Sequence, residues 1–115
     1  MASGDELLKV HTHRGSANDL ATAQVMITAG SGKTCTVISI SLCNTHASND
    51  ETFDIYIDTG SGDDTYLYLE QSLPAKSTFV HNDKIVLEAN DHLDVHCASG
   101  GGDIDIIVSY LEQEL

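Results

Sequence analysis

The chain has 115 residues and a mass of 12.3 kDa, which is the length of a single domain. Eighteen acidic residues stand against five basic ones, so the formal net charge is −13 at pH 7. This charge repels nucleic-acid phosphates and anionic lipid headgroups, and it argues against a direct role on DNA, on RNA or at a membrane surface.

Short alternating segments separated by turn residues run along the whole chain. Alternation with a period of two indicates β-strands, and no stretch keeps a helical periodicity beyond one or two turns. The expected strands are, in chain order, residues 7–13, 24–29, 34–43, 52–58, 65–71, 77–80, 84–88, 92–97 and 103–111. Eight to nine short strands at about ten-residue spacing predict an all-β fold, an antiparallel β-sandwich of jelly-roll-like type.

The same alternation predicts which side chains face the core. Apolar residues occupy every second position in the clearest strands, and polar residues lie between them. The side chains expected to point inward are Ile38, Ile40 and Leu42; Phe53, Ile55 and Ile57; and Ile104, Ile106, Val108 and Tyr110.

The N-terminal segment differs from the rest of the chain. Residues 5–14 are only weakly amphipathic, and residues 1–14 are predicted to form an arm or edge segment, whereas residues 15–115 form the sandwich domain. We expect the arm to lie across a neighbouring subunit or the shell, because an open sheet edge has to be paired or covered. The predicted interface residues are Leu8 and Val10, in an apolar groove, and Lys9 and Arg14, on acidic surface.

The stretch DHLDVHC (91–97) has the residue types of a metal site. On a strand, however, Leu93, Val95 and Cys97 point to the core while His92, Asp94 and His96 point away. His92 and His96 are then about 13 Å apart, too far to share one zinc ion. Either histidine could chelate together with Asp94 only if an outside partner joined them, so the sequence predicts no metal site.

Three other stretches are weaker candidates. HTHR (11–14) places two histidines on one strand face, but a solvent-facing strand is the simpler interpretation. DTGSGDD (58–64) lacks the bidentate glutamate of an EF-hand loop, since its twelfth position is Leu69. SGGGDID (99–105) lacks the glycine spacing of a calcium-binding repeat. Both glycine-rich stretches are predicted to be hairpin loops, and an adventitious calcium ion at Asp58–Asp64 stays open.

No catalytic motif is present: there is no GxSxG, HExxH, P-loop or GxGxxG sequence. We therefore expect neither enzymatic activity nor a cofactor. The three cysteines are odd in number and form no CxxC pair, so we expect free thiols rather than a disulfide framework. The start of the chain, MASGDELLKV, has no apolar run of signal-peptide length, and we expect no standard secretion signal.

One resemblance covers residues 24–112. The strings GSGKTCTVISISLCNT (30–45), YLYLEQSLPAKSTFV (66–80), DKIVLEANDHLDVHCASGG (83–101) and DIDIIVSYLE (103–112) are similar to segments of small tailed-phage virion structural proteins. Two positions depart from that family's pattern: Lys76 and Asn90 stand where glycine is usual. The pattern carries no catalytic residue.

The resemblance implies a capsid decoration or other exterior head protein. Such a protein would bind the major capsid protein or other virion subunits in many copies, as a homo-oligomer with a trimer favoured, in virions assembled in the host cytoplasm. A tail component, either a fibre tip or an adaptor, is the alternative, although the chain has no repeated shaft. A carbohydrate-binding module is a further alternative, with Tyr56, Tyr66 and Tyr68 as its platform if the three share a face.

Overall fold

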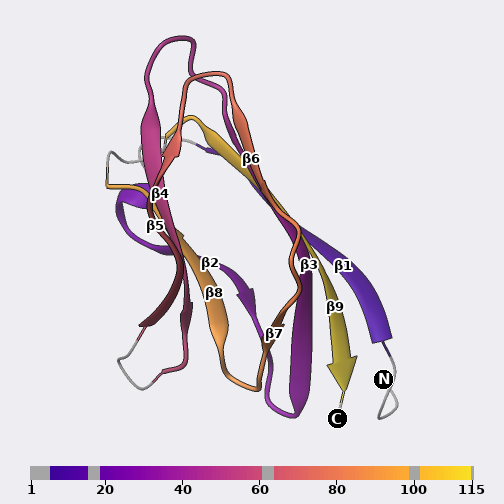
Figure 1. Cartoon of the computed structure of the whole chain (residues 1–115). Helices are drawn as coiled ribbons and strands as arrows, with labels where there is room; N and C mark the ends of the chain where they lie inside the picture. The colour runs from indigo at the N-terminus through magenta and orange to yellow at the C-terminus, as the bar shows by residue number, and fades with distance from the viewer. Residues whose placement is uncertain (1–5, 16–18, 61–63, 99–101, 115) are drawn as a thin grey trace.

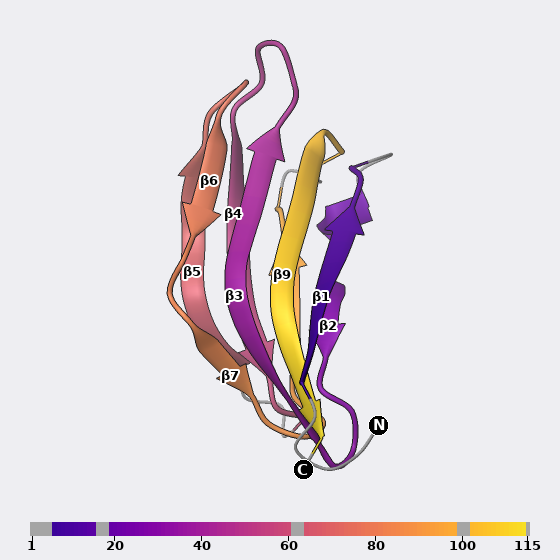
Figure 2. The same cartoon turned by 90° about the vertical axis from the view of Figure 1, so that its right-hand side faces the viewer.

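The fold is an antiparallel β-sandwich, as the sequence predicts (Figure 1). The structure is a computed structural model, and it describes residues 6–15, 19–60, 64–98 and 102–114. Two sheets face each other with their strands running along the long axis of the molecule (Figures 1 and 2). No helix among these residues is long and apolar enough to cross a membrane.

The first sheet contains the beginning and the end of the described chain. Its order is β1–β9–β3–β6, and β7 also pairs with β3. These strands are β1 (Glu6–His13), β9 (Ile104–Glu114), β3 (Lys33–Asn44), β6 (Thr78–His81) and β7 (Ile85–Leu87). β1 forms one edge of this sheet and pairs with β9 alone (Figure 2).

The second sheet has the order β2–β8–β4–β5. Its strands are β2 (Gln24–Thr28), β8 (His92–His96), β4 (Glu51–Asp58) and β5 (Asp64–Leu73). Each strand of the two sheets begins and ends within two residues of a segment that the sequence predicts, except that β9 ends three residues later than predicted. A single turn of 3-10 helix, η1 (Asp19–Ala21), precedes β2.

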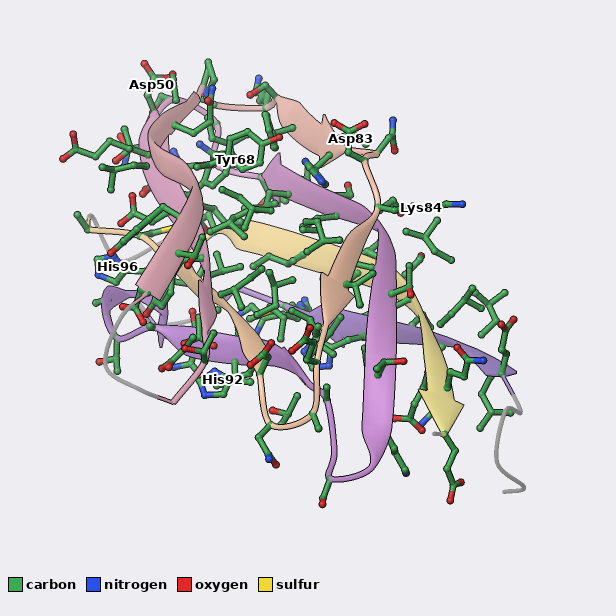
Figure 3. The ribbon with its side chains drawn as sticks, turned by 60° about the horizontal axis from the view of Figure 1, so that its bottom comes forward. Asp50, Tyr68, Asp83, Lys84, His92 and His96 are labelled. Carbon is green, nitrogen blue, oxygen red and sulfur yellow. The ribbon has the colours of Figure 1, made fainter. Side chains whose placement is uncertain are left out.

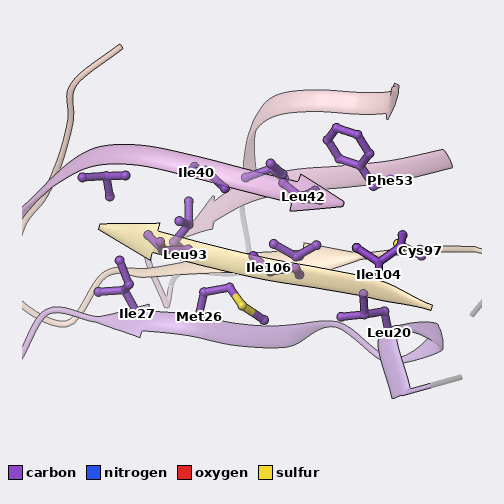
Figure 4. Close-up of a cluster of buried hydrophobic side chains, with 14 of the residues drawn as sticks. Leu20, Met26, Ile27, Ile40, Leu42, Phe53, Leu93, Cys97, Ile104 and Ile106 are labelled. Carbon is purple, nitrogen blue, oxygen red and sulfur yellow. The ribbon is translucent and has the colours of Figure 1, made fainter. Parts of the chain in front are cut away.

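The core fills the space between the two sheets (Figure 4). It is built mainly from aliphatic side chains, and Phe53 is its one fully buried ring among the described residues. Leu20 of η1 closes the core at one end, where its carbonyl accepts a 2.9 Å hydrogen bond from the Cys97 amide. The buried residues include Met26, Ile27, Cys35, Val37, Ile40, Leu42, Phe53, Ile55, Leu87, Leu93, Val95, Cys97, Ile104, Ile106 and Val108.

The predicted inward face of β3 is wrong at Ile38. The β3–β9 register shifts between Val37 and Ser39, which places a bulge there. Cys35 and Val37 are buried before the bulge, and Ile40 and Leu42 are buried after it, so the inward positions change from odd to even numbers. A bulge inserts one extra residue into the strand, and regular alternation cannot be continued across it.

Two turns contain non-glycine residues with positive φ. Lys76 has φ 61° in the turn between β5 and β6, and Asn90 has φ 72° in the turn before β8. These are the two positions at which the sequence departs from glycine in the phage-protein pattern that it resembles. The backbone of both turns therefore keeps the left-handed conformation that glycine adopts most easily.

Candidate functional site

The four residues predicted to form an interface lie on both sides of β1. Leu8 and Val10 point away from the core and are 73% and 62% exposed. Lys9 points to the other side, where its Nζ lies 3.2 Å from Oε1 of Glu112 in its own chain. Arg14 follows β1 and is exposed. The role of these residues at a neighbouring subunit stays a prediction.

Leu8 and Val10 belong to a larger surface on the outer side of the first sheet. Residues opposite each other in neighbouring strands point to the same side of a sheet, so the strand registers define this surface. Three cross-strand rows make it up: Leu8, Leu111, Thr36 and Val86; Val10, Ser109 and Ser39; and Thr12, Ile107, Ser41 and Val80. We call these residues the neutral face.

None of the residues of the neutral face is charged. The adjoining rows contain Glu6 at one end and Asp105 at the other, so the carboxylates lie outside the three rows. Five apolar side chains on it are about half exposed or more: Leu8, Val10, Val80, Val86 and Ile107 range from 49% to 73%. Depletion of charge at a patch with exposed apolar side chains is typical of the centre of a protein–protein interface.

The outer side of the second sheet has the opposite character. Its cross-strand pairs are Asp54 with His96, Tyr56 with Asp94, and Asp58 with His92, and Asp64 stands opposite Asp58 on β5. We call this surface, together with Tyr66, the acidic face. The sandwich is thus polarised, with carboxylates across one broad side and uncharged side chains at the centre of the other.

The three tyrosines proposed as a carbohydrate platform do not share a face. Tyr56 and Tyr66 form a ring pair on the acidic face, with centroids 5.1 Å apart. Tyr68 packs instead against Phe53 and Phe79 of the core. The cause is the irregular β4–β5 register, in which Tyr68 pairs with Ile55 but Tyr66 pairs with Tyr56.

The stretch DHLDVHC is β8 with the residues that flank it. Leu93, Val95 and Cys97 are fully buried, as the alternation predicts. His92 and His96 lie well apart on the opposite side of the strand (Figure 3). His96 Nδ1 is 3.1 Å from Oδ2 of Asp54 on β4, and this pair has no third metal-binding group near it among the described residues.

His92 has more partners than the sequence predicts. Its Nδ1 is 2.7 Å from Oδ1 of Asp94, and its Nε2 is 3.7 Å from Oδ2 of Asp58. Asp58 belongs to the DTGSGDD stretch, and nothing in the sequence indicates that this stretch lies beside DHLDVHC. Only the pairing of β4 with β8 brings the two stretches together, and no local motif indicates it. Residues 61–63 of that stretch lie outside the described residues.

The carboxylates of Asp58, Asp64 and Asp94 raise the pKa values of two groups beside them on the acidic face. The hydrogen bond to Asp94 raises the pKa of His92, and the charges of Asp94, Asp58 and Asp64 add to the effect. Burial, with the charges of Asp94 and Asp64, raises the pKa of Tyr56 to about 12. The charge contributions to both shifts indicate a negative local potential that favours cations.

The remaining candidates have simple structural roles. His13, on the inner side of β1, places its Nε2 3.0 Å from Oδ2 of Asp19. Asp58 also accepts a 2.8 Å hydrogen bond from the Gly60 amide, a contact typical of an aspartate that starts a turn. Residues 99–101 of SGGGDID lie outside the described residues. The three cysteines form no disulfide among the described residues, and Cys35 and Cys97 are buried.

Comparison with known proteins identifies the fold. No protein-family model matches the chain, and no curated protein matches its sequence. A protein of the Bacillus endospore appendages, described as disulfide-linked pili, is similar at a TM-score of 0.53 and 10% identity, over 98% of this chain and 89% of that one. A chain of the acid-stable capsid of Helicobacter pylori bacteriophage KHP30 is similar at 0.52 and 10% identity, over 97% and 90%. At these identities the likeness is one of fold.

Proposed function

We propose that this chain is a non-enzymatic virion structural protein, an exterior head or decoration protein of a tailed bacteriophage. It attaches in many copies, as a small homo-oligomer, through the neutral face. The observation that carries this proposal is the absence of charge across the three rows of that face in a chain of net charge −13.

The neutral face is suited to lie against another protein. Burying an unpaired carboxylate costs far more free energy than burying a serine or threonine, whose hydroxyl can find a partner. Leu8, Val10 and Ile107 supply apolar area that becomes stabilising when it is removed from water. A strongly acidic protein also avoids repulsion between copies, or against an acidic shell, if it docks through an uncharged side.

The acidic face suits the opposite, solvent-facing side of such a protein. Dense display on a shell brings many copies close together, and like charges on their outer sides keep assembled particles from sticking to one another. The same charges disfavour binding to packaged nucleic acid.

The order of the strands supports the assignment to virion proteins of jelly-roll type. Along the chain, β1 belongs to the first sheet, β2 to the second and β3 to the first again, while β4 and β5 belong to the second. The chain therefore crosses repeatedly between the first sheet, of order β1–β9–β3–β6 with β7 beside β3, and the second sheet, of order β2–β8–β4–β5. Double-sheet jelly rolls with such crossings are used in viral capsids and in lectins.

Particle composition tests the proposal. Virions of the phage or prophage that encodes the chain are purified, and its peptides are quantified by mass spectrometry against the major capsid protein. Fab fragments raised against the purified chain then locate it by negative-stain electron microscopy. We expect many copies per particle and labelled heads. Labelled tails would support the tail alternative instead, and particles without the chain would overturn the proposal.

A further inference from the structure

The corner of the acidic face at Asp58, His92 and Asp94 has the donor atoms of a cation site. Each of the three residues offers one ligand atom, and these atoms all lie within 4.8 Å of one another. They come from two hydrogen-bonded strands, since Asp58 on β4 pairs directly with His92 on β8. The backbone that carries them is thus held by the sheet and not by a loop.

The hydrogen bond at one ring nitrogen of His92 sets the role of the other. A carboxylate only accepts, so Nδ1 carries the proton in the 2.7 Å bond to Asp94. In the neutral ring, Nε2 then has a free lone pair on the side of Asp58. A carboxylate–histidine pair of this kind orients the imidazole in many metal sites and makes it a better ligand.

The spacing of His92 and Asp58 fits a shared cation better than direct contact. Their 3.7 Å separation, Nε2 to Oδ2, is too long for a hydrogen bond. Two ligands that each lie about 2.0–2.2 Å from one zinc ion are separated by about this distance. The two atoms are therefore placed as ligands of an ion between them.

None of the described residues that make up the acidic face is lysine or arginine. Asp94 is buried, with 7% of its side chain exposed, and Asp64 adds a carboxylate opposite Asp58. Even a protonated His92 leaves the group of Asp58, Asp64 and Asp94 with a negative charge. Lys9 and Lys33 both bind Glu112 of the first sheet. A divalent cation would compensate this excess.

We propose that Asp58 and His92 bind a divalent transition-metal cation of the zinc class, with Asp94 holding the imidazole in place. Imidazole together with carboxylate favours such an ion over calcium, which prefers oxygen ligands alone. Asp64 offers a further carboxylate, and water fills the remaining positions. The sequence alone predicts no metal here because Asp58 is 34 positions away from His92. This proposal does not depend on the function proposed above.

The acidic face provides its own control. His96 and Asp54 form a second histidine–aspartate pair across the same two strands, but without a third group. The full chain, freed of metal by chelator, is titrated with Zn²⁺ by calorimetry and with Co²⁺ by absorption spectroscopy. The variants are Asp58→Asn, His92→Gln and the matched control His96→Gln, each checked for folding by circular dichroism.

We expect one Zn²⁺ per chain in the wild type. Zn²⁺ affinity should fall at least about tenfold in Asp58→Asn and in His92→Gln, because even the loss of a residue that only hydrogen-bonds to a metal ligand has an effect of this size. In His96→Gln the affinity should stay unchanged. The proposal is overturned if the wild type binds no Zn²⁺. It is also overturned if Asp58→Asn and His92→Gln bind as the wild type does, or if all three variants lose affinity equally, since the ion is then adventitious. Should one variant fail to fold, the other decides the outcome.

Discussion

The phenol oxygen of Tyr68 lies 2.7 Å from Nδ1 of His81, in a hydrogen bond that crosses from one sheet of the sandwich to the other. His81 is buried, and its Nε2 lies 2.8 Å from the carbonyl oxygen of Asp83. That carbonyl can only accept, so Nε2 carries a proton and, in the neutral ring, Nδ1 accepts from Tyr68. The labelled Tyr68 and Asp83 in Figure 3 mark the two sides of this link.

Replacing Tyr68 by phenylalanine should lower the free energy of unfolding by about 1–3 kcal/mol, because Nδ1 of a buried ring is left without a donor. Urea denaturation measures the loss. Tyr66→Phe is the matched control, since Tyr66 is 48% exposed, and it should change stability by less than about 0.5 kcal/mol. Equal losses in both variants would mean that the link across the sheets contributes nothing.

Charges placed on the neutral face should abolish docking without unfolding the protein. Val10→Lys puts a cation into the middle row and Ile107→Lys puts one into the row beside it, and burial of that cation against a partner would be costly. Sedimentation analysis of the purified chain and binding to particles lacking it measure the effect.

Val25→Lys is the matched control for these variants. Val25 is 46% exposed, but it pairs with Asp94 on the acidic face. We expect it to dock as the wild type does. If the control loses docking while the two neutral-face variants keep it, the molecule attaches by the other side.

Stability should fall as the pH rises above about 9. Burial raises the pKa of the Cys97 thiol from 9.0 to about 12. Between these values the unfolded chain has released the proton while the folded chain keeps it, so the unfolded state gains relative stability with increasing pH. Tyr56, whose pKa is raised to about 12, acts in the same direction at still higher pH.

Urea denaturation at pH 7.5 and pH 10.5 checks this slope. Cys97→Ala should make it shallower, although the variant is less stable at every pH because a core side chain is shortened. Val95→Ala, which shortens another fully buried core side chain but removes no thiol, should leave the slope as it is. An unchanged slope in Cys97→Ala would contradict the assignment to this thiol.

Lys76→Gly should stabilise the protein. Lys76 has φ 61°, a conformation in which a side chain costs roughly 1–2 kcal/mol and glycine costs almost nothing sterically. Greater freedom of glycine in the unfolded chain offsets part of this, so the net gain should be a few tenths to about 1 kcal/mol. Lys84→Gly, at an exposed lysine between β6 and β7, is the control and should bring no gain. Thermal melts compare the two.

Much of the fold can be predicted from the alternation of apolar and polar residues. A strand with one buried side has an apolar residue at every second position, and this pattern is visible in the sequence. Ile55, Leu93 and Ile106 lie where this period puts them. The period fails at Ile38 and between Tyr66 and Tyr68, where bulges insert residues that no local pattern marks. The position of a bulge depends on how neighbouring strands pair and pack, and the sequence of one strand alone does not show this.

The candidate sites depend on strand order even more strongly. The uncharged positions of β3 and β9 are visible in the sequence as Ser39, Ser41 and Ser109, but only their pairing makes them one surface. In the same way, His92 and Asp94 are conspicuous, whereas Asp58 joins them through a register between distant segments. Such long-range pairing is fixed by the whole core and not by any motif.

The place of β9 has a consequence for biosynthesis. This strand follows all other described strands in the chain, yet it lies between β1 and β3 in the middle of its sheet. A nascent chain on the ribosome therefore cannot complete that sheet until residues 104–114 have left the exit tunnel. Until then β1 has no partner strand, and the apolar inner side of β3 is only partly covered. Folding dominated by such distant pairings is slow and leaves apolar surface exposed in intermediates, so we expect the nascent protein to be prone to aggregation until β9 pairs.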